Sequence, residues 1–258
     1  MNTFRILQFN MQFGQGWDDD RPDEAPVDLK ATIAEIRRHQ ADIVLLQEVE
    51  KARRDGSQPA QPPNYNWLKR ELTEFTDCYF ALPRPDPREL PFGIGLAIFS
   101  RTPLRNRLRR ILPSPPIPFE FQGEEKTPTD RLLIGAHTTI HGREIQVLNT
   151  HLLAFFMLKH SSEEHRDQRA MVAETLRAAT SPAIIGGDFN VHEHTSLVAQ
   201  MAEIGYNTAQ QSEITWRRYP YILDHLFYQA ATLRCVHCQV CPTRASDHHA
   251  LLADFDFA

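Results

Sequence analysis

Short apolar runs alternate along the chain with segments whose apolar residues recur at helical spacing. Residues 27–39 carry Leu29 and Ile33 one turn apart on a single face, which predicts a helix. Residues 42–49 contain four consecutive apolar residues, a run typical of a strand that is buried on both faces. With a first strand predicted over residues 4–13, these segments form a β–α–β unit. The pattern therefore predicts strands packed against helices.

Strands dominate the rest of the predicted structure. Further strands are predicted over residues 95–100, 131–140, 144–151, 183–187, 222–228, 233–241 and 249–255, and helices near residues 67–75, 162–179 and 197–204. Residues 53–63 and 113–128 concentrate proline, glycine and charge, which predicts irregular loops. Neither loop is long enough to divide the chain, so we expect a single domain over residues 1–258.

Composition and charge limit the possible partners. The chain of 258 residues has 28 basic and 33 acidic residues and a net charge of −5, so any binding of nucleic acid must be local. Three of the four cysteines are Cys235, Cys238 and Cys241, which is not the pattern of a disulfide-stabilised secreted domain. Strand alternation places Cys238 opposite the other two, which argues against a structural metal. With a polar N-terminal segment and no apolar stretch of ~20 residues, we expect a soluble cytoplasmic protein without an integral membrane segment.

Acidic, amide and histidine residues recur at the ends of the predicted apolar strands. One acidic or amide residue at a strand end usually caps a turn. Several together supply carboxylate oxygens for a hard divalent cation and groups that orient a water molecule. The positions are Asn10, Gln47-Glu48, Asn149 to His151, Asp188 to Asn190, Asp224-His225 and Ser246 to His249.

The most specific of these motifs is Gly186-Gly187-Asp188-Phe189-Asn190. Two glycines allow the backbone to approach a site closely. On an extended chain, Asp188 and Asn190 project to the same side because they are two residues apart. The motif therefore predicts a carboxylate and an amide that face one site.

Taken in order, these motifs resemble those of the endonuclease/exonuclease/phosphatase superfamily, and the resemblance extends from Asn10 to Asp254. It implies an α/β fold, a DNase I-like sandwich of two packed, mainly antiparallel sheets flanked by helices, with the site at one end. It also implies an enzyme, a metal-dependent hydrolase of phosphate esters with Mg²⁺ or Mn²⁺ as cofactor. The motifs that carry the resemblance are Asn10, Gln47-Glu48, Asn149-Thr150-His151-Leu152, Gly187-Asp188-Phe189-Asn190, Leu223-Asp224-His225 and Ser246-Asp247-His248.

The resemblance implies a metal site and a water site. Glu48 would be the principal metal ligand, with Asn10 beside it. Asp247 would approach the metal from the opposite side. Asp188 would orient or deprotonate the attacking water.

The resemblance also implies groups that bind the phosphate. Asn190 would hold it, and His151 would donate to a non-bridging oxygen. His248 would face the phosphate as a base or as a charged stabiliser. Asp224 would fix the tautomer of His248, so we expect the two side chains to lie within hydrogen-bond distance.

The sequence motifs indicate the type of reaction more closely than they indicate the substrate. His151 stands where abasic-site endonucleases usually have tyrosine, and the Trp-Cys-Asp-Arg run of inositol 5-phosphatases is absent around Asp224. Our leading interpretation is a phosphodiesterase of nuclease type that acts on a phosphate ester, possibly DNA or RNA. The alternatives are a sphingomyelinase-like lipid phosphodiesterase, a small-molecule phosphatase and, least favoured, a non-catalytic binding relative.

Two segments bear on that choice. Arg105, Arg107 and Arg109 alternate along one predicted strand and would either track a phosphate backbone or protect a solvated edge strand. Residues 152–158 are apolar and follow His151 directly, so they would form either core or an apolar surface beside the phosphate site.

Overall fold

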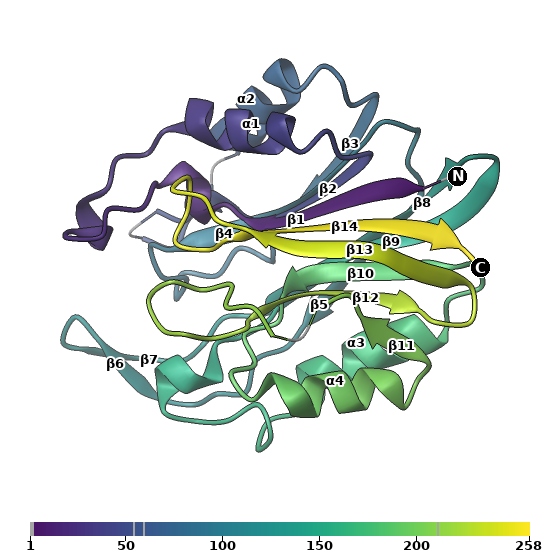
Figure 1. Cartoon of the computed structure of the whole chain (residues 1–258). Helices are drawn as coiled ribbons and strands as arrows, with labels where there is room; N and C mark the ends of the chain where they lie inside the picture. Colours follow the sequence, from purple (N-terminus) through teal and green to yellow (C-terminus); the bar gives the residue numbers. More distant parts are fainter. Residues whose placement is uncertain (1–2, 54, 59, 211) are drawn as a thin grey trace.

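The computed structural model describes residues 3–53, 55–58, 60–210 and 212–258, and in it two six-stranded sheets lie face to face (Figure 1). The first sheet contains, in spatial order, β13 (Leu233–Cys241), β14 (Ala250–Phe257), β1 (Phe4–Asn10), β2 (Ile43–Lys51), β4 (Gly93–Ser100) and β3 (Asp77–Ala81). Its β1 and β2 are parallel, and its other described neighbours are antiparallel.

The second sheet repeats this plan. It contains, in spatial order, β11 (Tyr206–Thr208), β12 (Asp224–Gln229), β10 (Ala183–Asp188), β9 (Arg143–His151), β8 (Arg131–Ile140) and β5 (Arg105–Leu112). Here β9 and β10 are parallel, and the other described neighbours are antiparallel. The predicted sandwich of two mainly antiparallel sheets is therefore confirmed.

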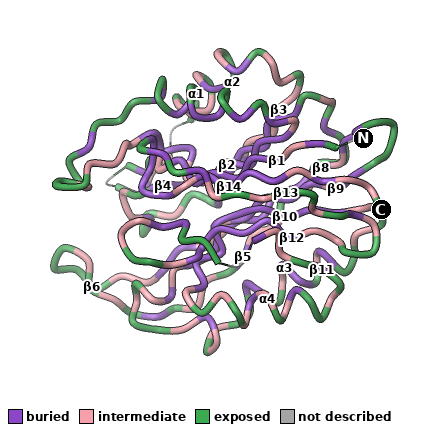
Figure 2. Tube along the Cα trace, viewed as in Figure 1, coloured by how far each residue is buried: buried purple, intermediate pink, exposed green. Residues whose placement is uncertain are grey.

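Helices cover the outer face of each sheet (Figure 1). The first sheet is covered by α1 (Leu29–Arg38) and α2 (Pro63–Glu71), and the second by α3 (Asp167–Arg177) and α4 (His194–Ala202). Among the described residues, one large apolar cluster lies between the sheets and one lies under each pair of helices. Figure 2 shows the same layering, with buried strands inside and exposed outer faces on the helices. No helix in the described ranges is long and apolar enough to cross a bilayer.

The structure corrects several predicted element boundaries. The first strand ends at Asn10 rather than residue 13, because Gln12 and Phe13 have φ angles of 43° and 46° in the 3-10 helix η1 (Gln12–Gly14). The helix predicted near residues 67–75 begins at Pro63, a residue that suits the first helical turn. The last strand begins at Ala250 and continues to Phe257.

Four short strands, β3, β11 and the two strands of a hairpin, fall in regions where no strand was predicted. The strand β3 has five residues and lies at a sheet edge. The hairpin of β6 (Phe119–Phe121) and β7 (Glu124–Lys126) lies inside the segment predicted as an irregular loop, so that prediction was wrong for these residues. In the other predicted loop, residues 53–63, Arg54 and Pro59 lie outside the described residues.

A β-bulge in β13 also changes the predicted placement of the cysteines. The register shifts between Cys235 and His237, so an extra residue enters the strand. Cys235 and Cys238 consequently pack against the same cluster between the sheets, whereas Cys241 packs under the helices. The predicted alternation was wrong at Cys235, because one inserted residue reverses the direction of every side chain beyond it.

The two adjacent glycines of β10, Gly186 and Gly187, differ in how well they would tolerate a side chain. A Cβ on Gly187 would lie 2.2 Å from the Thr150 carbonyl oxygen, which belongs to the backbone of the neighbouring strand. A Cβ on Gly186 would meet the ends of the Leu45 and Leu226 side chains at 2.6 and 2.8 Å, and these ends can rotate away. Close strand packing at this point therefore requires glycine mainly at position 187.

We expect Gly187→Ala to lower the free energy of unfolding by at least the ~1–3 kcal/mol typical of an overpacked core. Gly186→Ala is the matched control and should cost less, since only side-chain ends must move. Urea denaturation followed by circular dichroism measures both values. Equal losses for the two variants would contradict this account of the strand contact.

Candidate active site

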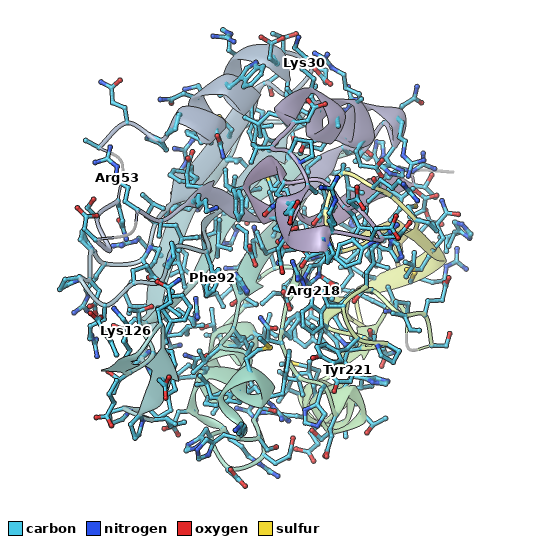
Figure 3. All side chains as sticks on the ribbon, turned by 90° about the vertical axis from the view of Figure 1, so that its left-hand side faces the viewer. Lys30, Arg53, Phe92, Lys126, Arg218 and Tyr221 are labelled. Atoms are coloured by element: carbon cyan, nitrogen blue, oxygen red, sulfur yellow. The ribbon has the colours of Figure 1, made fainter. Side chains whose placement is uncertain are left out.

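The carboxyl ends of the two parallel strand pairs meet at one end of the sandwich. In the first sheet, Asn10 at the end of β1 pairs with Gln47 of β2. In the second sheet, His151 at the end of β9 pairs with Asp188 at the end of β10. Figure 3 looks at this end of the molecule, which is remote from both termini in Figure 1. The site is therefore assembled from both sheets.

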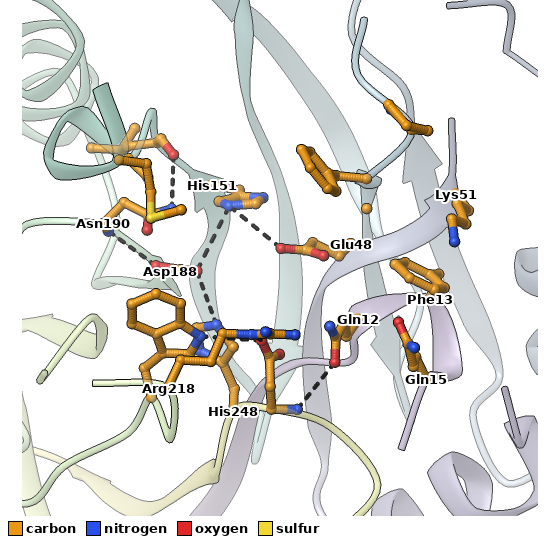
Figure 4. A pocket seen from close by; sticks show the side chains of 18 of the residues that line it. Gln12, Phe13, Gln15, Glu48, Lys51, His151, Asp188, Asn190, Arg218 and His248 are labelled. Atoms are coloured by element: carbon orange, nitrogen blue, oxygen red, sulfur yellow. Dashed lines mark hydrogen bonds and ion pairs between the residues drawn. The ribbon is translucent and has the colours of Figure 1, made fainter. Parts of the chain in front are cut away.

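Glu48 reaches the site because β2 is bulged. The register between β2 and β4 shifts between Gln47 and Glu50, and Glu48 has a φ angle of 51°, which is unusual for a residue with a side chain. The opposite strand provides room only because residue 93 is glycine, since a Cβ there would lie 2.0 Å from Glu48 Oε2. The carboxylate consequently points into the cleft (Figure 4).

The Asp188–Asn190 motif adopts a different geometry from the one predicted. Asn190 has a φ angle of 51°, so the chain is not extended through this residue and that prediction was wrong. The Asn190 backbone N–H donates to Asp188 Oδ1 at 3.0 Å, and its amide Nδ2 donates to the Leu152 carbonyl oxygen at 3.0 Å. Both residues still line the cleft, but by a turn rather than by strand alternation.

A chain of buried amides connects the two sheets below the site. Gln8 Nε2 donates to Asp224 Oδ1 and to Gln47 Oε1, both at 2.7 Å. Gln47 Nε2 donates to Asn149 Oδ1 at 2.7 Å. Asn149 Nδ2 in turn donates to the backbone oxygens of Leu46 and Ala97. All three amide side chains are fully buried, so these hydrogen bonds are needed to keep their polar groups paired.

Asp224 and His248 form the closest charged pair of the site. Asp224 Oδ2 and His248 Nδ1 are 2.8 Å apart, and both residues are buried, so the expected contact is present. Two N–H groups, those of Leu223 and Asp224, donate to the Thr215 hydroxyl and fix this end of β12. His248 Nε2 is left facing Asp188, 3.6 Å from Oδ2 (Figure 4).

The cleft raises the pKa of two carboxyl groups, Asp188 and Glu48, and of one histidine, His248. Burial, together with the charge of Asp224, raises the pKa of Asp188 to about 8. Burial and the charge of Asp247 raise the pKa of Glu48. Burial alone would lower the pKa of His248, but the charges of Asp224 and Asp188 outweigh it and raise this pKa to about 10. Positive charge is therefore favoured in the cleft.

His151 differs from His248 in its electrostatics. Burial and the nearby charge of Arg131 lower the pKa of His151 to about 3, so the imidazole is neutral at pH 7. Its Nε2 lies 3.9 Å from Glu48 Oε1 and 3.7 Å from Asp188 Oδ2. Ligand atoms of these three residues lie within 4.8 Å of one another, close enough to share one cation.

Two predicted metal ligands are oriented toward other partners. Asn10 Nδ2 donates to Glu48 Oε1 at 3.0 Å and to Asp188 Oδ2 at 3.1 Å, while Asn10 Oδ1 accepts from the Gln12 N–H. In this orientation Asn10 holds the two carboxylates rather than offering an oxygen to an ion. Its role as a metal ligand stays a prediction.

Asp247 is held by two residues whose role was not predicted. Trp216 Nε1 donates to Asp247 Oδ2 at 3.2 Å, and Arg218 Nε donates to the same oxygen at 3.0 Å. Arg218 also binds Asp23, so it links the loop before α1 to the site. Isolated β-bridges from Trp216 to Tyr221 and to His248 place Trp216, and with it the nearby Arg218, beside Asp247. No sequence motif indicates this position.

Arg131 is a further cleft residue that sequence reasoning missed. It is the first residue of β8, next to Leu132, which pairs with His151. Within the described residues, its buried Nε has no hydrogen-bond partner. The two strands were predicted with nearly correct bounds, so pairing them as a hairpin would have placed Arg131 beside His151.

The cleft itself has a volume of about 570 Å³ and is lined by residues of both sheets and their loops. Phe92 and Arg218 lie near the centre of the face in Figure 3. All predicted site residues except Asn10 and Asp224 line the cleft directly, and those two lie behind Glu48 and His248. The described residues that line it are Gln12, Phe13, Gln15, Asp23, Glu48, Lys51, Pro91, Phe92, Gly93, Arg131, His151, Leu152, Ala154, Phe156, Met157, Asp188, Asn190, Trp216, Arg218, Asp247 and His248.

The arginine stripe does not face this cleft. Arg105, Arg107 and Arg109 are exposed on β5, the edge strand of the second sheet. Arg105 pairs with His137, whereas the site lies at the other end of β8, near Arg131. Arg107 forms an ion pair with Asp77 at 2.9 Å. These contacts fit a solvated edge strand.

The apolar run after His151 is divided between core and cleft. Leu152, Leu153 and Phe155 are buried. Phe156 and Met157 line the cleft from the 3-10 helix η3 (Phe155–Leu158), and Met157 is 62% exposed. An apolar wall therefore lies beside the site, as one of the two interpretations of this run predicted.

Comparison with known proteins places this site in a family. The model of the Endonuclease/Exonuclease/phosphatase family matches residues 7–248. The chain belongs to this family. Members of the family are hydrolases that act on phosphate esters and generally use divalent metal ions. The predicted superfamily and the predicted class of enzyme, a phosphoesterase, are thereby confirmed.

Relatives of known sequence match only part of the chain. A UPF0294 protein of Vibrio cholerae is 30% identical over 121 residues, which are 44% of this chain and 41% of that protein. A UPF0294 protein of Yersinia enterocolitica is 29% identical over 143 residues, which are 51% of this chain and 52% of that protein. The chain thus matches about half or less of the length of these relatives.

Solved structures of the family match over the whole chain. An endonuclease/exonuclease/phosphatase from Beutenbergia cavernae has a TM-score of 0.74 and 20% identity and covers 100% of this chain and 72% of its own. The human Nocturnin catalytic domain has a TM-score of 0.67 and 21% identity, with coverages of 100% and 94%. A mannosyl-6-phosphatase from Bacteroides thetaiotaomicron has a TM-score of 0.69 and 16% identity, with coverages of 98% and 100%. These similarities show the family's fold.

We expect Asp224→Asn to lower the pKa of His248, because the substitution removes the nearest negative charge from a buried imidazole. Imidazole nitrogen chemical shifts, measured by NMR against pH in the presence of EDTA, report this pKa directly. Asp254→Asn, at the far end of β14, is the control and should leave it unchanged. An unaltered His248 pKa in Asp224→Asn would show that the two residues do not interact as described.

Proposed function

We propose that the chain hydrolyses phosphodiesters with the help of Mg²⁺ or Mn²⁺, by direct attack of a water molecule on phosphorus. The proposal rests on one observation, that Glu48 and Asp188 lie close to the Asp224–His248 pair at one cleft. Carboxylates of raised pKa provide a place for a cation, and a protonated imidazole provides a donor for the phosphate.

The donor set fits a hard divalent cation. Glu48 would be the principal ligand, with Asp188 and His151 facing the same point and with Asn10 and Asp247 beside them. Oxygen donors dominate this set, which is the preference of Mg²⁺ and Mn²⁺. When bound, the cation would neutralise charge on the phosphate and on the leaving oxygen.

Residues of the chain itself would transfer the proton and stabilise the charge on the phosphate. Asp188 would accept the proton of the attacking water, because a cation held beside it would favour the ionised carboxylate against the burial that raises its pKa to about 8. His248, held in a fixed orientation by Asp224, would donate from Nε2 to the phosphate as the charged stabiliser. The new bond joins the water oxygen to phosphorus, the bond from phosphorus to the ester oxygen breaks, and this oxygen takes a proton from solvent water and leaves as the alcohol.

Two further cleft residues would bind the phosphate. Arg131 is cationic, has a buried Nε without a partner among the described residues, and lies near His151. Guanidinium groups suit phosphate oxygens because they present several donors in one plane. The neutral His151 would donate a hydrogen bond from its ring. The Asn190 amide is already engaged by Leu152, so its predicted contact with the phosphate would require it to leave that partner.

The nature of the esterified alcohol is less constrained. The edge-strand arginines run away from the cleft, which weakens the strongest local argument for nucleic acid. Phe156, Met157 and Phe92 line the cleft and favour an apolar group near the phosphate. A purely binding role is the weakest alternative, because each position carried over from the superfamily retains a residue of the expected kind.

We expect EDTA to abolish hydrolysis of bis(p-nitrophenyl) phosphate and Mg²⁺ or Mn²⁺ to restore it. Glu48→Gln should raise the metal concentration needed for half-maximal rate by at least ~10-fold, since a charged ligand is lost. Glu144→Gln, an exposed change at the far end of β9, is the matched control. Full activity in EDTA would refute the role of the metal.

We expect His248→Ala to reduce turnover by at least ~100-fold, the scale for one proton-donating group. His237→Ala removes an exposed histidine from β13 and should leave the rate unchanged. Steady-state kinetics at saturating Mn²⁺ measures both. Nearly full turnover in His248→Ala would remove this residue from the mechanism.

A further inference from the structure

A second cavity opens beside the catalytic cleft. Its volume is about 340 Å³, and it lies between the β6–β7 hairpin, residues 88–93 and the segment that contains η3. The two cavities share wall residues, namely Phe92, Gly93, Arg131, Ala154 and Met157. A substrate held in the cleft can therefore extend into this side cavity.

Most of the wall of the side cavity is apolar. Phe119 and Phe121 of the hairpin face Leu90, Leu153 and Leu158. The rings of Phe92 and Phe121 meet edge to face, with centroids 5.6 Å apart. Such a wall binds a ligand by burial of its apolar surface and offers little recognition of polar groups.

Four polar residues of this wall, Arg88, Glu89, Thr127 and Thr129, are already held in hydrogen bonds. The buried Glu89 carboxylate accepts from the Thr129 hydroxyl at 3.0 and 2.9 Å. Arg88 binds Asp86 and the Thr127 hydroxyl. Few polar groups are thus free to recognise a base or a sugar.

Two large apolar side chains stand exposed where the cavities join. Phe92 is 54% exposed and Met157 is 62% exposed. Each lines both cavities. Exposed apolar residues gathered at a cavity mouth are characteristic of ligand contact, because covering them removes apolar surface from water.

Arg131 marks where the charged end of the ligand would lie. It lines both cavities, and within the described ranges its buried Nε has no partner. A phosphate that binds this guanidinium beside Glu48 and His151 would direct one of its ester arms across Phe92 and Met157. That arm would enter the apolar cavity.

We propose that the side cavity is the binding site for one ester arm of the substrate and that this arm is a hydrocarbon chain. The preferred substrate class is then phosphodiesters that carry an aliphatic alcohol on one side. The inference rests on the proposed phosphodiesterase function and adds the identity of one arm. Water, phosphate and leaving alcohol exchange bonds as described above, and the side cavity contributes binding only.

The test measures binding of methyl, butyl and octyl phosphate by calorimetry in the presence of Mg²⁺. Each methylene that enters the cavity should improve affinity by up to about fourfold until the cavity is filled. Octyl phosphate should therefore bind at least ~10-fold more tightly than methyl phosphate. Thymidine 5′-phosphate should bind more weakly than octyl phosphate.

Substitutions in the side cavity test whether the dependence of affinity on chain length arises there. Phe121→Asp places a charge in the side cavity and should reduce octyl phosphate to the affinity of methyl phosphate. Met157→Asp, at an already exposed position, should do the same if Phe121→Asp proves unstable. Glu125→Gln changes an exposed residue of the same hairpin and should keep the dependence on chain length.

The outcomes separate this inference from the proposed function. Hydrolysis of bis(p-nitrophenyl) phosphate without any dependence of binding on chain length would overturn the hydrocarbon site alone. Tighter binding of phenyl phosphate or of thymidine 5′-phosphate than of octyl phosphate would also overturn it. Absence of metal-dependent hydrolysis would instead overturn the proposed function.

Discussion

The buried amide chain of Gln8, Gln47 and Asn149 is the contact on which the geometry of the site depends. It connects the inner strands of both sheets and ends on the Asp224 carboxylate. Apolar packing between sheets fixes their separation but is not directional. Hydrogen bonds with defined angles fix the register of one sheet against the other, because a buried amide without its partner is costly. Groups from opposite sheets are thereby held at a constant distance.

Repulsion among like charges is the second constraint. Burial makes ionisation of Glu48 and Asp188 unfavourable, and the charge of Asp247 in the same space adds to this effect at Glu48. The protein partly balances them with its own cations, Arg218 on Asp247 and His248 between two aspartates. Within the described part of the chain, the imidazole that lies near Glu48 is that of the neutral His151, so this contact does not neutralise the carboxylate.

The sequence was sufficient for the long strands and for a group of residues that the fold brings together at one cleft, and insufficient where a single backbone distortion decides the direction of a side chain. The apolar run of β8 located this strand with correct bounds, since burial leaves a strong pattern. The bulge in β13 and the turn at Asn190 leave no such pattern, because each depends on one residue's φ angle or on pairing with a distant strand. Arg131 was missed for a related reason, since its position follows from strand pairing and not from any motif.

The left-handed backbone at Glu48 has a consequence for the evolution of the fold. A residue held at positive φ opposite an obligatory glycine stores strain, and its buried carboxylate adds a cost of desolvation. Glycine at position 48 would relieve both, so the residue best suited to hold the proposed cation is not the residue that gives the most stable fold. A lineage released from selection for catalysis would accordingly lose this glutamate early and gain stability as it did so.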